Sequence, residues 1–425
     1  MKFETSKLSN GLRIISARMP QAQSVAVAML AGVGSRHEDY PKNGGVSHFL
    51  EHLLFKGTKK RPSTQVIAEA VDGVGGNNNA YTTNDLTNYY IKLPRKHTDL
   101  ALDILSDMIQ NPLLDPAEVD RERGAVIEEM NMRRDDPASF VHMVFPELLW
   151  PSDPLGRAVI GSEEVIKTIS RDAIAEYQAL HYSPDNLVVA VAGDVQHDHI
   201  TAQIDSLMGA MKPHTLPKFD QLNSTLAADR VKAVTKQTNQ AHIVIGCQAY
   251  PYNHRLDMAA RVMTNMLGAG LSSRLFINVR ERQGLAYSVY ADYDNFVDAG
   301  EFDVYAGVNL DKIPQAISSV MAELTRVRQE AVGEAELTKV KNKMSGGLQM
   351  ALENTFAVAD RVGRRLVLLD QVKTPEETLA EIEQVTAEDV MAAARDLLEP
   401  GKLRMAIIAP DTTEAATRFE ELTAA

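Results

Sequence analysis

The chain has very little cysteine and no long apolar run. Cys247 is the one cysteine in 425 residues, so no disulfide can form within the chain, and a reducing compartment fits. No segment approaches the roughly 18 to 20 apolar residues of a membrane span. The start, MKFETSKLSNGLRII, lacks the features of a secretory signal or a transit peptide. We expect a cytoplasmic protein with no membrane partner, although a chain whose targeting segment had been removed would look the same.

Long basic blocks are also absent. The sequence carries 44 Lys and Arg against 57 Asp and Glu, a formal net charge of -13. Nucleic-acid binding depends on basic side chains that neutralise phosphates. We therefore expect no nucleic-acid partner. The acidity is compatible with basic peptides as ligands, but it more commonly serves solubility.

Two long stretches, residues 165–195 and 381–411, follow the same order of elements. Each has a helix start signal, at Ser170 or Thr386, then a helix, a turn and a β-branched strand. The two stretches are about 216 to 217 residues apart. This spacing indicates an internal duplication.

The same offset aligns the strand expected from Ser24 with the strand expected from Ala241. We predict two homologous domains, 1–212 and 231–425, joined by a Pro-containing polar linker, 213–230. Strands and helices do not alternate as regular βα units. We therefore predict an α+β fold, with a sheet-plus-helix layer in each domain, rather than a doubly wound sheet.

The stretch GGVSHFLEHLLFKG, residues 44–57, carries the polar residues of most interest. On a helix, His48 and His52 are four apart and project from one face, where two imidazoles can share a zinc ion. Glu51 can then sit beside a metal-bound water, in the H-x-x-E-H order of inverzincins. A pair of packed core histidines is the alternative. The duplicated positions, 265–269, have lost both histidines and the glutamate, which indicates one centre per chain.

Catalytic zinc needs a third protein ligand and an open position for water. A second helix, expected to start at Pro116, carries Glu122 and Glu129 two turns apart on one face. A solvated surface is the alternative for most charges of this helix.

Together these residues resemble the pitrilysin and mitochondrial processing peptidase family of zinc metallopeptidases. In that family H-x-x-E-H is followed, after 76 residues, by a glutamate ligand, and here Glu129 stands 77 places after His52. The resemblance implies His48, His52 and Glu129 as ligands of one zinc ion. It also implies Glu51 as the general base and Glu122 as a residue that orients the site.

The stretch GVGGNNNAYTTNDLTNYYIKL, residues 73–93, resembles the substrate-binding edge strand of that family. An exposed edge can accept an extended peptide as an added strand, and we expect Asn79, Ala80 and Tyr81 to make this contact. An ordinary hairpin tip is the alternative. Phe55 and Tyr81 could also form an apolar wall beside the residue after the scissile bond, unless Phe55 belongs to the core.

The second half contains the R-x6-Y pair of the family in NVRERQGLAYSVYADY. By resemblance, Arg280 would hold substrate carbonyls, and the Tyr287 hydroxyl would stabilise the developing oxyanion. Arg282 is the competing arginine, but its spacing to Tyr287 is wrong.

The resemblance covers almost the whole chain. It implies two domains that face one another around a chamber, and a zinc endopeptidase that cleaves oligopeptides or short unfolded polypeptides. It also implies pairing, as a homodimer or a heterodimer with a related subunit. The alternatives are a catalytic subunit active only with its partner, a non-catalytic scaffold, and a short S-ribosylhomocysteinase, whose catalytic cysteine the distant Cys247 does not match. His197 and His199 are expected in a solvated loop.

Overall fold

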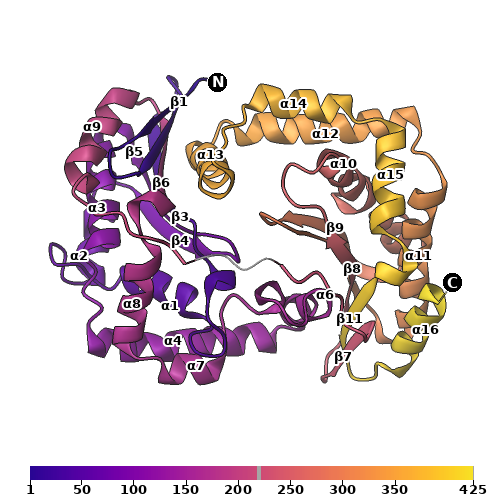
Figure 1. Cartoon of the computed structure of the whole chain (residues 1–425). Helices are drawn as coiled ribbons and strands as arrows, with labels where there is room; N and C mark the ends of the chain where they lie inside the picture. Colours follow the sequence, from indigo (N-terminus) through magenta and orange to yellow (C-terminus); the bar gives the residue numbers. More distant parts are fainter. Residues whose placement is uncertain (218–221, 425) are drawn as a thin grey trace. The chain divides into compact units, whose positions relative to one another are not determined.

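The computed structural model describes residues 1–217 and 222–424, and it divides into two compact units (Figure 1). Unit 1 comprises Met1–Met130, Ala158–Asp220 and Leu348–Pro375. Unit 2 comprises Asn131–Arg157, Gln221–Gly347 and Glu376–Ala425. Part of the predicted linker 213–230, residues 218–221, lies outside the described residues.

Unit 1 contains a six-stranded sheet in the order β1-β2-β6-β3-β5-β4. Its β2 and β6 run parallel, and every other neighbouring pair is antiparallel. The strands are β1 (Phe3–Lys7), β2 (Arg13–Arg18), β3 (Ser24–Ala31), β4 (Asn77–Thr82), β5 (Thr87–Pro94) and β6 (Leu187–Gly193). β4 is therefore an edge strand.

Unit 2 contains a five-stranded sheet in the order β7-β11-β8-β10-β9, also with one parallel pair, β7 and β11. The strands are β7 (Val231–Thr235), β8 (Ala241–Ala249), β9 (Ala286–Asn295), β10 (Gly300–Val308) and β11 (Arg404–Ala409). Strands that correspond in the duplication occupy corresponding places, so that β8 takes the place of β3 and β9 that of β4. The prediction of an α+β fold with two related sheet-and-helix layers is confirmed.

Helices cover both faces of each sheet. In unit 1 they are α1 (Val46–Leu54), α2 (Thr64–Asp72), α3 (Thr98–Gln110), α7 (Glu163–Thr168), α8 (Arg171–His181), α9 (His197–Met208) and α13 (Thr355–Leu369). In unit 2 they are α5 (Pro137–Val144), α6 (Pro146–Leu149), α10 (Asp257–Gly268), the π-helix η5 (Phe276–Arg282), α11 (Ile313–Gln329), α14 (Pro375–Gln384), α15 (Ala387–Leu397) and α16 (Thr413–Thr423). Two helices pass from one unit to the other, α4 (Pro116–Asp135) and α12 (Glu334–Ala351).

The two halves of the sequence exchange a segment in each direction. In unit 1, α13 comes from the second half and packs Val358, Val362 and Leu366 onto the central strands β3 and β6. In Figure 1 it is the orange helix beside these strands. In unit 2, α5 and α6 come from the first half and pack Val141 and Phe145 against β8 and β11. Central strands read as almost wholly apolar because both faces are covered. The boundaries 1–212 and 231–425 stay a prediction about the duplicated halves.

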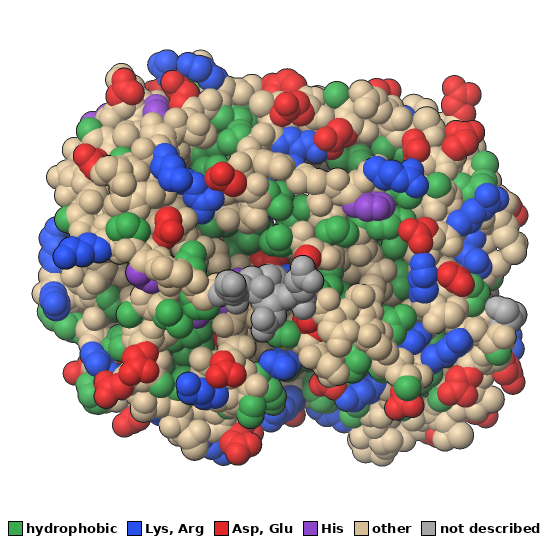
Figure 2. Space-filling model, viewed as in Figure 1, with side chains coloured by type: hydrophobic (Ala, Val, Ile, Leu, Met, Phe, Trp, Pro, Cys, Tyr) green, Lys and Arg blue, Asp and Glu red, His purple; other side chains and the backbone are tan. Residues whose placement is uncertain are grey.

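Charged side chains of both signs lie interspersed on the face shown in Figure 2. In the part of the chain that the structure describes, no helix is long and apolar enough to cross a membrane. Cys247 is fully buried in β8. His197 and His199 do not lie in a loop but in the first turn of α9. The ring nitrogens of His197 lie 2.7 Å from Ser6 Oγ and 2.9 Å from Ser16 Oγ.

Candidate metal centre

The helix that carries the two histidines, α1, is fixed at its N-terminus by backbone geometry and one carboxylate. Gly45 has a φ of 96°, and a Cβ there would lie 2.7 Å from the Ile160 carbonyl oxygen, so only glycine fits. The Glu38 carboxylate accepts from the backbone N–H of Gly45 (2.6 Å) and of Ser47 (2.8 Å). This satisfies donors that a helix start leaves open. The Gly-Gly pair before the motif therefore sets where α1 begins.

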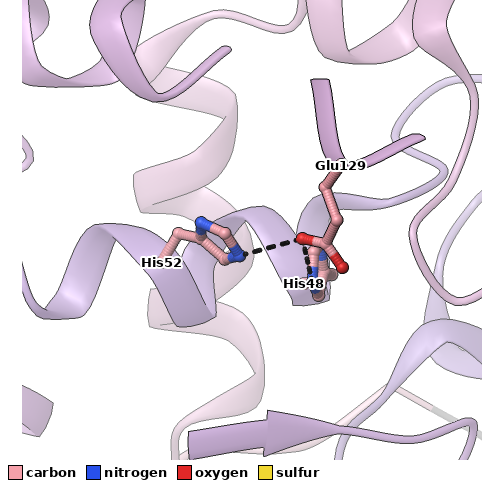
Figure 3. A group of neighbouring side chains, drawn as sticks. All are labelled: His48, His52 and Glu129. Atoms are coloured by element: carbon pink, nitrogen blue, oxygen red, sulfur yellow. Dashed lines mark ion pairs between the residues drawn. The ribbon is translucent and has the colours of Figure 1, made fainter. Parts of the chain in front are cut away.

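His48, His52 and Glu129 meet in one cluster, as the sequence predicts. The two imidazoles project from the same face of α1, with ring centroids 4.7 Å apart, and Glu129 reaches them from α4 (Figure 3). Glu129 Oε2 lies 3.6 Å from Nε2 of His48 and 3.6 Å from Nε2 of His52. One ligand atom from each of the three residues lies within 4.8 Å of the other two.

The donor set fits zinc. Two imidazole nitrogens and one carboxylate oxygen form the set of a catalytic zinc site that keeps a fourth position open. Ligand atoms at about 2.0–2.2 Å from a tetrahedral ion lie about 3.3–3.6 Å from one another. The observed N–O separations of 3.6 Å match this spacing and are too long for direct hydrogen bonds. The side chains stay partly accessible, from 11% for His48 to 26% for His52.

The helix of the third ligand, α4, is tied to unit 1 by Arg123. The guanidinium of Arg123 donates to the backbone carbonyls of Ile166 and Ile169, and it lies over the Phe49 ring of α1 at 5.7 Å. Arg123 follows Glu122 directly on α4, and Phe49 follows His48 directly on α1. Glu129 therefore reaches the histidines from a helix whose orientation is fixed.

Glu122 lies behind His52, as the sequence predicts for an orienting residue. Glu122 Oε2 is 3.2 Å from His52 Nδ1, and Oε1 accepts from Lys56 Nζ at 2.6 Å. When Nδ1 carries the proton and donates to Glu122, Nε2 is left with its lone pair toward the cluster. Sequence reasoning missed Lys56, which its spacing of four residues from His52 could have indicated.

Carboxylates set the electrostatics of the cluster. Burial by itself would lower the pKa of His52, but the hydrogen bond with Glu122 and the charges of Glu51, Glu122 and Glu129 together raise it. Burial by itself would raise the pKa of Glu122, but the contacts with His52 and Lys56 outweigh the effect of burial. The pKa of Glu122 is therefore lowered. The same concentration of negative charge favours a bound dication.

Glu51 lies on α1 beside the cluster and is not one of its three members. Burial raises the pKa of its carboxyl above the usual range, and a hydrogen bond from Thr82 opposes this rise. Thr82 Oγ1 donates to Glu51 Oε2 at 2.6 Å. A carboxylate with a raised pKa beside a metal site suits a general base. Thr82 was not among the predicted residues, although it lies next to the predicted Tyr81.

The predicted substrate strand is β4, and among the described residues it pairs with β5 and no other strand. The side chain of Asn79 accepts from the Ala80 backbone N–H at 2.8 Å. Tyr81 turns toward α13 and donates its hydroxyl to Asp360. Phe55 lies on the opposite, α1 face of the sheet, 6.3 Å from the ring of Tyr89. The structure thus does not bring Phe55 and Tyr81 together as one wall, and the substrate contacts of these residues stay predictions.

Arg280 and Tyr287 belong to unit 2, at the end of η5 and the start of β9. The Arg280 guanidinium lies 5.6 Å from the centroid of the Tyr287 ring and 4.7 Å from that of Phe276. Tyr287 is 75% exposed on the edge strand of its sheet. Arg282 instead bonds Asn278 within the same helix, at 3.0 Å. The pairing of Arg280 with Tyr287 is thus observed, and their action on the metal cluster stays a prediction.

Relatives that match almost the whole chain are named as zinc proteases. An uncharacterized zinc protease of Streptomyces coelicolor is 35% identical over 98% of this chain and 92% of its own length. One from Bacillus subtilis is 33% identical over 94% of this chain and 97% of its own. The family model described as insulinase (peptidase family M16) matches residues 13–163. The chain belongs to the M16 family of peptidases.

Solved structures agree with the M16 fold at lower identity. A protease from Helicobacter pylori aligns with a TM-score of 0.90 at 24% identity, over 96% of this chain and 99% of its own. A peptidase M16 inactive domain from Pseudomonas fluorescens aligns with a TM-score of 0.89 at 17% identity, over 97% and 98%. These likenesses show the fold alone.

A second M16 family model matches a different part of the chain. The family model described as the peptidase M16 inactive domain matches residues 168–344, a range that contains none of the three clustered residues. In the duplicated copy the pentad falls on Asn265 to Ala269, and Glu129 falls on Gly346. All three polar side chains of the cluster are thus confined to the first copy.

Proposed function

We propose that this chain is a zinc-dependent endopeptidase that hydrolyses oligopeptides or short unfolded polypeptides. The observation that carries the proposal is the convergence of His48, His52 and Glu129 within 4.8 Å, with Glu51 beside them. Two imidazoles and one carboxylate leave an open position on zinc, which a hydrolytic site needs and a structural site lacks. The names of the relatives, all zinc proteases, support the same metal and reaction class.

Each residue of the cluster then has a role in the reaction. His48, His52 and Glu129 would hold the zinc ion, which when bound would lower the pKa of a water to about 7 and polarise a carbonyl. Glu51 takes the proton of the attacking water and passes it to the departing amine. Glu122, held by Lys56, keeps the proton of His52 on Nδ1, so that Nε2 stays available as a ligand.

The substrate side rests on the two edge strands. The open edge of β4, around Asn79, Ala80 and Tyr81, can add an extended peptide through backbone hydrogen bonds, which makes binding tolerant of sequence. Phe55 would contact the residue after the scissile bond. We assign Arg280 to the substrate carbonyls and the exposed Tyr287 hydroxyl to the oxyanion.

We further propose that the chain works in the cytoplasm and pairs, either with a second copy or with a related subunit. The composition supports the compartment, since one buried cysteine suits reducing conditions. The family resemblance supports the pairing.

The test uses the purified full chain, a quenched fluorescent peptide and a measurement of bound zinc. We expect one zinc ion per chain, hydrolysis that a chelator stops and zinc restores, and no turnover by Glu51→Gln at full zinc content. Hydrolysis only after addition of a related subunit would identify a catalytic subunit of a heterodimer. Full activity in Glu51→Gln, or no zinc bound to the wild-type chain, would refute the proposal.

A further inference from the structure

The geometry points to Thr82 as a positioning residue for the proposed general base, because its hydroxyl fixes the carboxylate of Glu51. This inference rests on the proposed function, in which Glu51 moves the proton. It adds a residue from β4, a strand otherwise assigned to the substrate. It also connects the base to α13, a helix from the other half of the sequence.

The contact itself is short and specific. Thr82 Oγ1 lies 2.6 Å from Glu51 Oε2, within the range of a strong O–H donor to a carboxylate. A threonine hydroxyl has one proton to donate, and here a carboxylate oxygen accepts it. One oxygen of Glu51 is thereby occupied, and the other stays available to receive a proton from water. The bond also fixes the plane of a side chain that otherwise has three rotatable bonds.

Strand alternation explains why Thr82 faces the helix of the metal ligands. Neighbouring side chains of a strand point to opposite faces of the sheet. Tyr81 points to the α13 face, where its hydroxyl donates to Asp360, and so Thr82 points to the α1 face and Glu51. The register agrees, since Tyr81 pairs with Asn88, which also donates to Asp360 at 2.9 Å.

Asp360 thus holds β4 and β5 together from α13. It accepts from one side chain on each strand, and Arg364, one turn further along α13, lies 5.9 Å over the Tyr81 ring. An edge strand with one neighbour has few backbone restraints of its own. The side-chain contacts to α13 therefore limit the twist of β4, and with it the direction in which Thr82 donates.

The expected effect follows from the loss of one orienting bond. Thr82→Val keeps the shape and β-branching of the side chain and removes the donor. Because a displacement of about 1 Å can cost 10²-fold in rate, we expect kcat to fall about 10- to 100-fold, with KM changed by less than about twofold. Thr82→Ser, which keeps the hydroxyl, should recover most of the wild-type kcat. Zinc content should stay at the wild-type value in both variants.

Thr5→Val is the matched control, because Thr5 is exposed on β1, the opposite edge strand of the same sheet. It makes the same chemical change away from Glu51, and we expect wild-type kinetics. Crystal structures of the zinc-loaded wild type and Thr82→Val give a readout that does not depend on turnover. The Glu51 carboxylate should leave its position, or occupy several rotamers, in the variant.

The outcomes separate the two proposals. An inactive Glu51→Gln together with a fully active Thr82→Val, or an unmoved Glu51 in the structure of Thr82→Val, overturns the role of Thr82 and leaves the peptidase proposal intact. An active Glu51→Gln overturns both. Equal loss in Thr82→Val and Thr82→Ser, with lower zinc content, would assign Thr82 to the stability of the fold and would also refute the positioning role.

Discussion

Gly363→Ala tests the exchange of α13 between the halves of the sequence, because Gly363 faces the sheet at close range. A Cβ at this position would lie 2.5 Å from Leu30 Cδ1 and 2.9 Å from Ala190 Cβ. The Leu30 methyl can rotate away, but the Ala190 Cβ is attached directly to a central strand. The helix itself must therefore move outward to accept one methyl group.

Two opposing effects set the magnitude. An alanine in the interior of a helix is favoured over glycine by about 1 kcal/mol. Overpacking in a close-packed core costs about 1–3 kcal/mol. Because α13 buries Val362 and Leu366 beside this position, the outward shift also loosens the apolar contacts around it. We expect the overpacking to dominate and the free energy of unfolding to fall, by up to about 2 kcal/mol.

Gly124→Ala is the matched control. Gly124 lies inside α4, and its Cβ would meet nothing within 4 Å, so the change should stabilise the protein by about 0.5–1 kcal/mol. Urea unfolding followed by circular dichroism gives both values from shifts of the midpoint. If Gly363→Ala stabilised the protein as much as Gly124→Ala, the close packing of α13 on β3 and β6 would be wrong.

Three further predictions concern the centre and the stability of unit 1. Glu122→Gln should weaken zinc binding about 10- to 100-fold, because His52 loses the carboxylate that fixes its Nδ1 proton. Equilibrium dialysis measures the zinc affinity, and an unchanged affinity would contradict the role of Glu122. Tyr287→Phe should lower kcat about 10²- to 10³-fold at full zinc content, as expected for one lost oxyanion donor, and wild-type kcat in a peptide assay would remove Tyr287 from the mechanism. Burial, with nearby positive charge, lowers the pKa values of His37 and His181 to about 4, against about 6.5 in the unfolded chain. As the pH falls, the unfolded chain binds these protons first. The free energy of unfolding is therefore constant above about pH 6.5 and falls between about pH 6.5 and 4. This loss is on the order of 3 kcal/mol for the two histidines together, after allowance for solvent screening. Urea midpoints measured across this range test the sign, and His37→Asn with the same pH dependence as the wild type would exclude His37 as a source.

The sequence predicted the parts of the site that follow from local geometry. His48 and His52 share a helix face because they are four residues apart, and that relation needs no knowledge of the fold. Glu129 came from the spacing of a known family, which already contains the tertiary information. Thr82 and Lys56 were missed, since a hydroxyl in a strand and a lysine after a helix are common.

The exchange of segments was beyond the reach of sequence patterns for a related reason. Amphipathic periodicity shows that a helix such as α13 has an apolar face, but it does not show which sheet that face covers. The duplication suggested two self-contained halves, because repeats at a fixed offset usually fold as units. The contacts of Val358, Val362 and Leu366 with the sheet of unit 1 are set by packing between residues more than 150 positions apart.

The exchange predicts that the first half will not hold the site by itself. Residues 1–212 include every proposed metal ligand, but without α13 the face formed by Ala26, Leu30 and Ala190 has no cover. Asp360 would be missing as well, and with it the hydrogen bonds that connect β4 and β5 to α13. The copy that lost its histidines therefore still contributes to the centre, because it supplies the helix that completes the core and orients the strand beside Glu51.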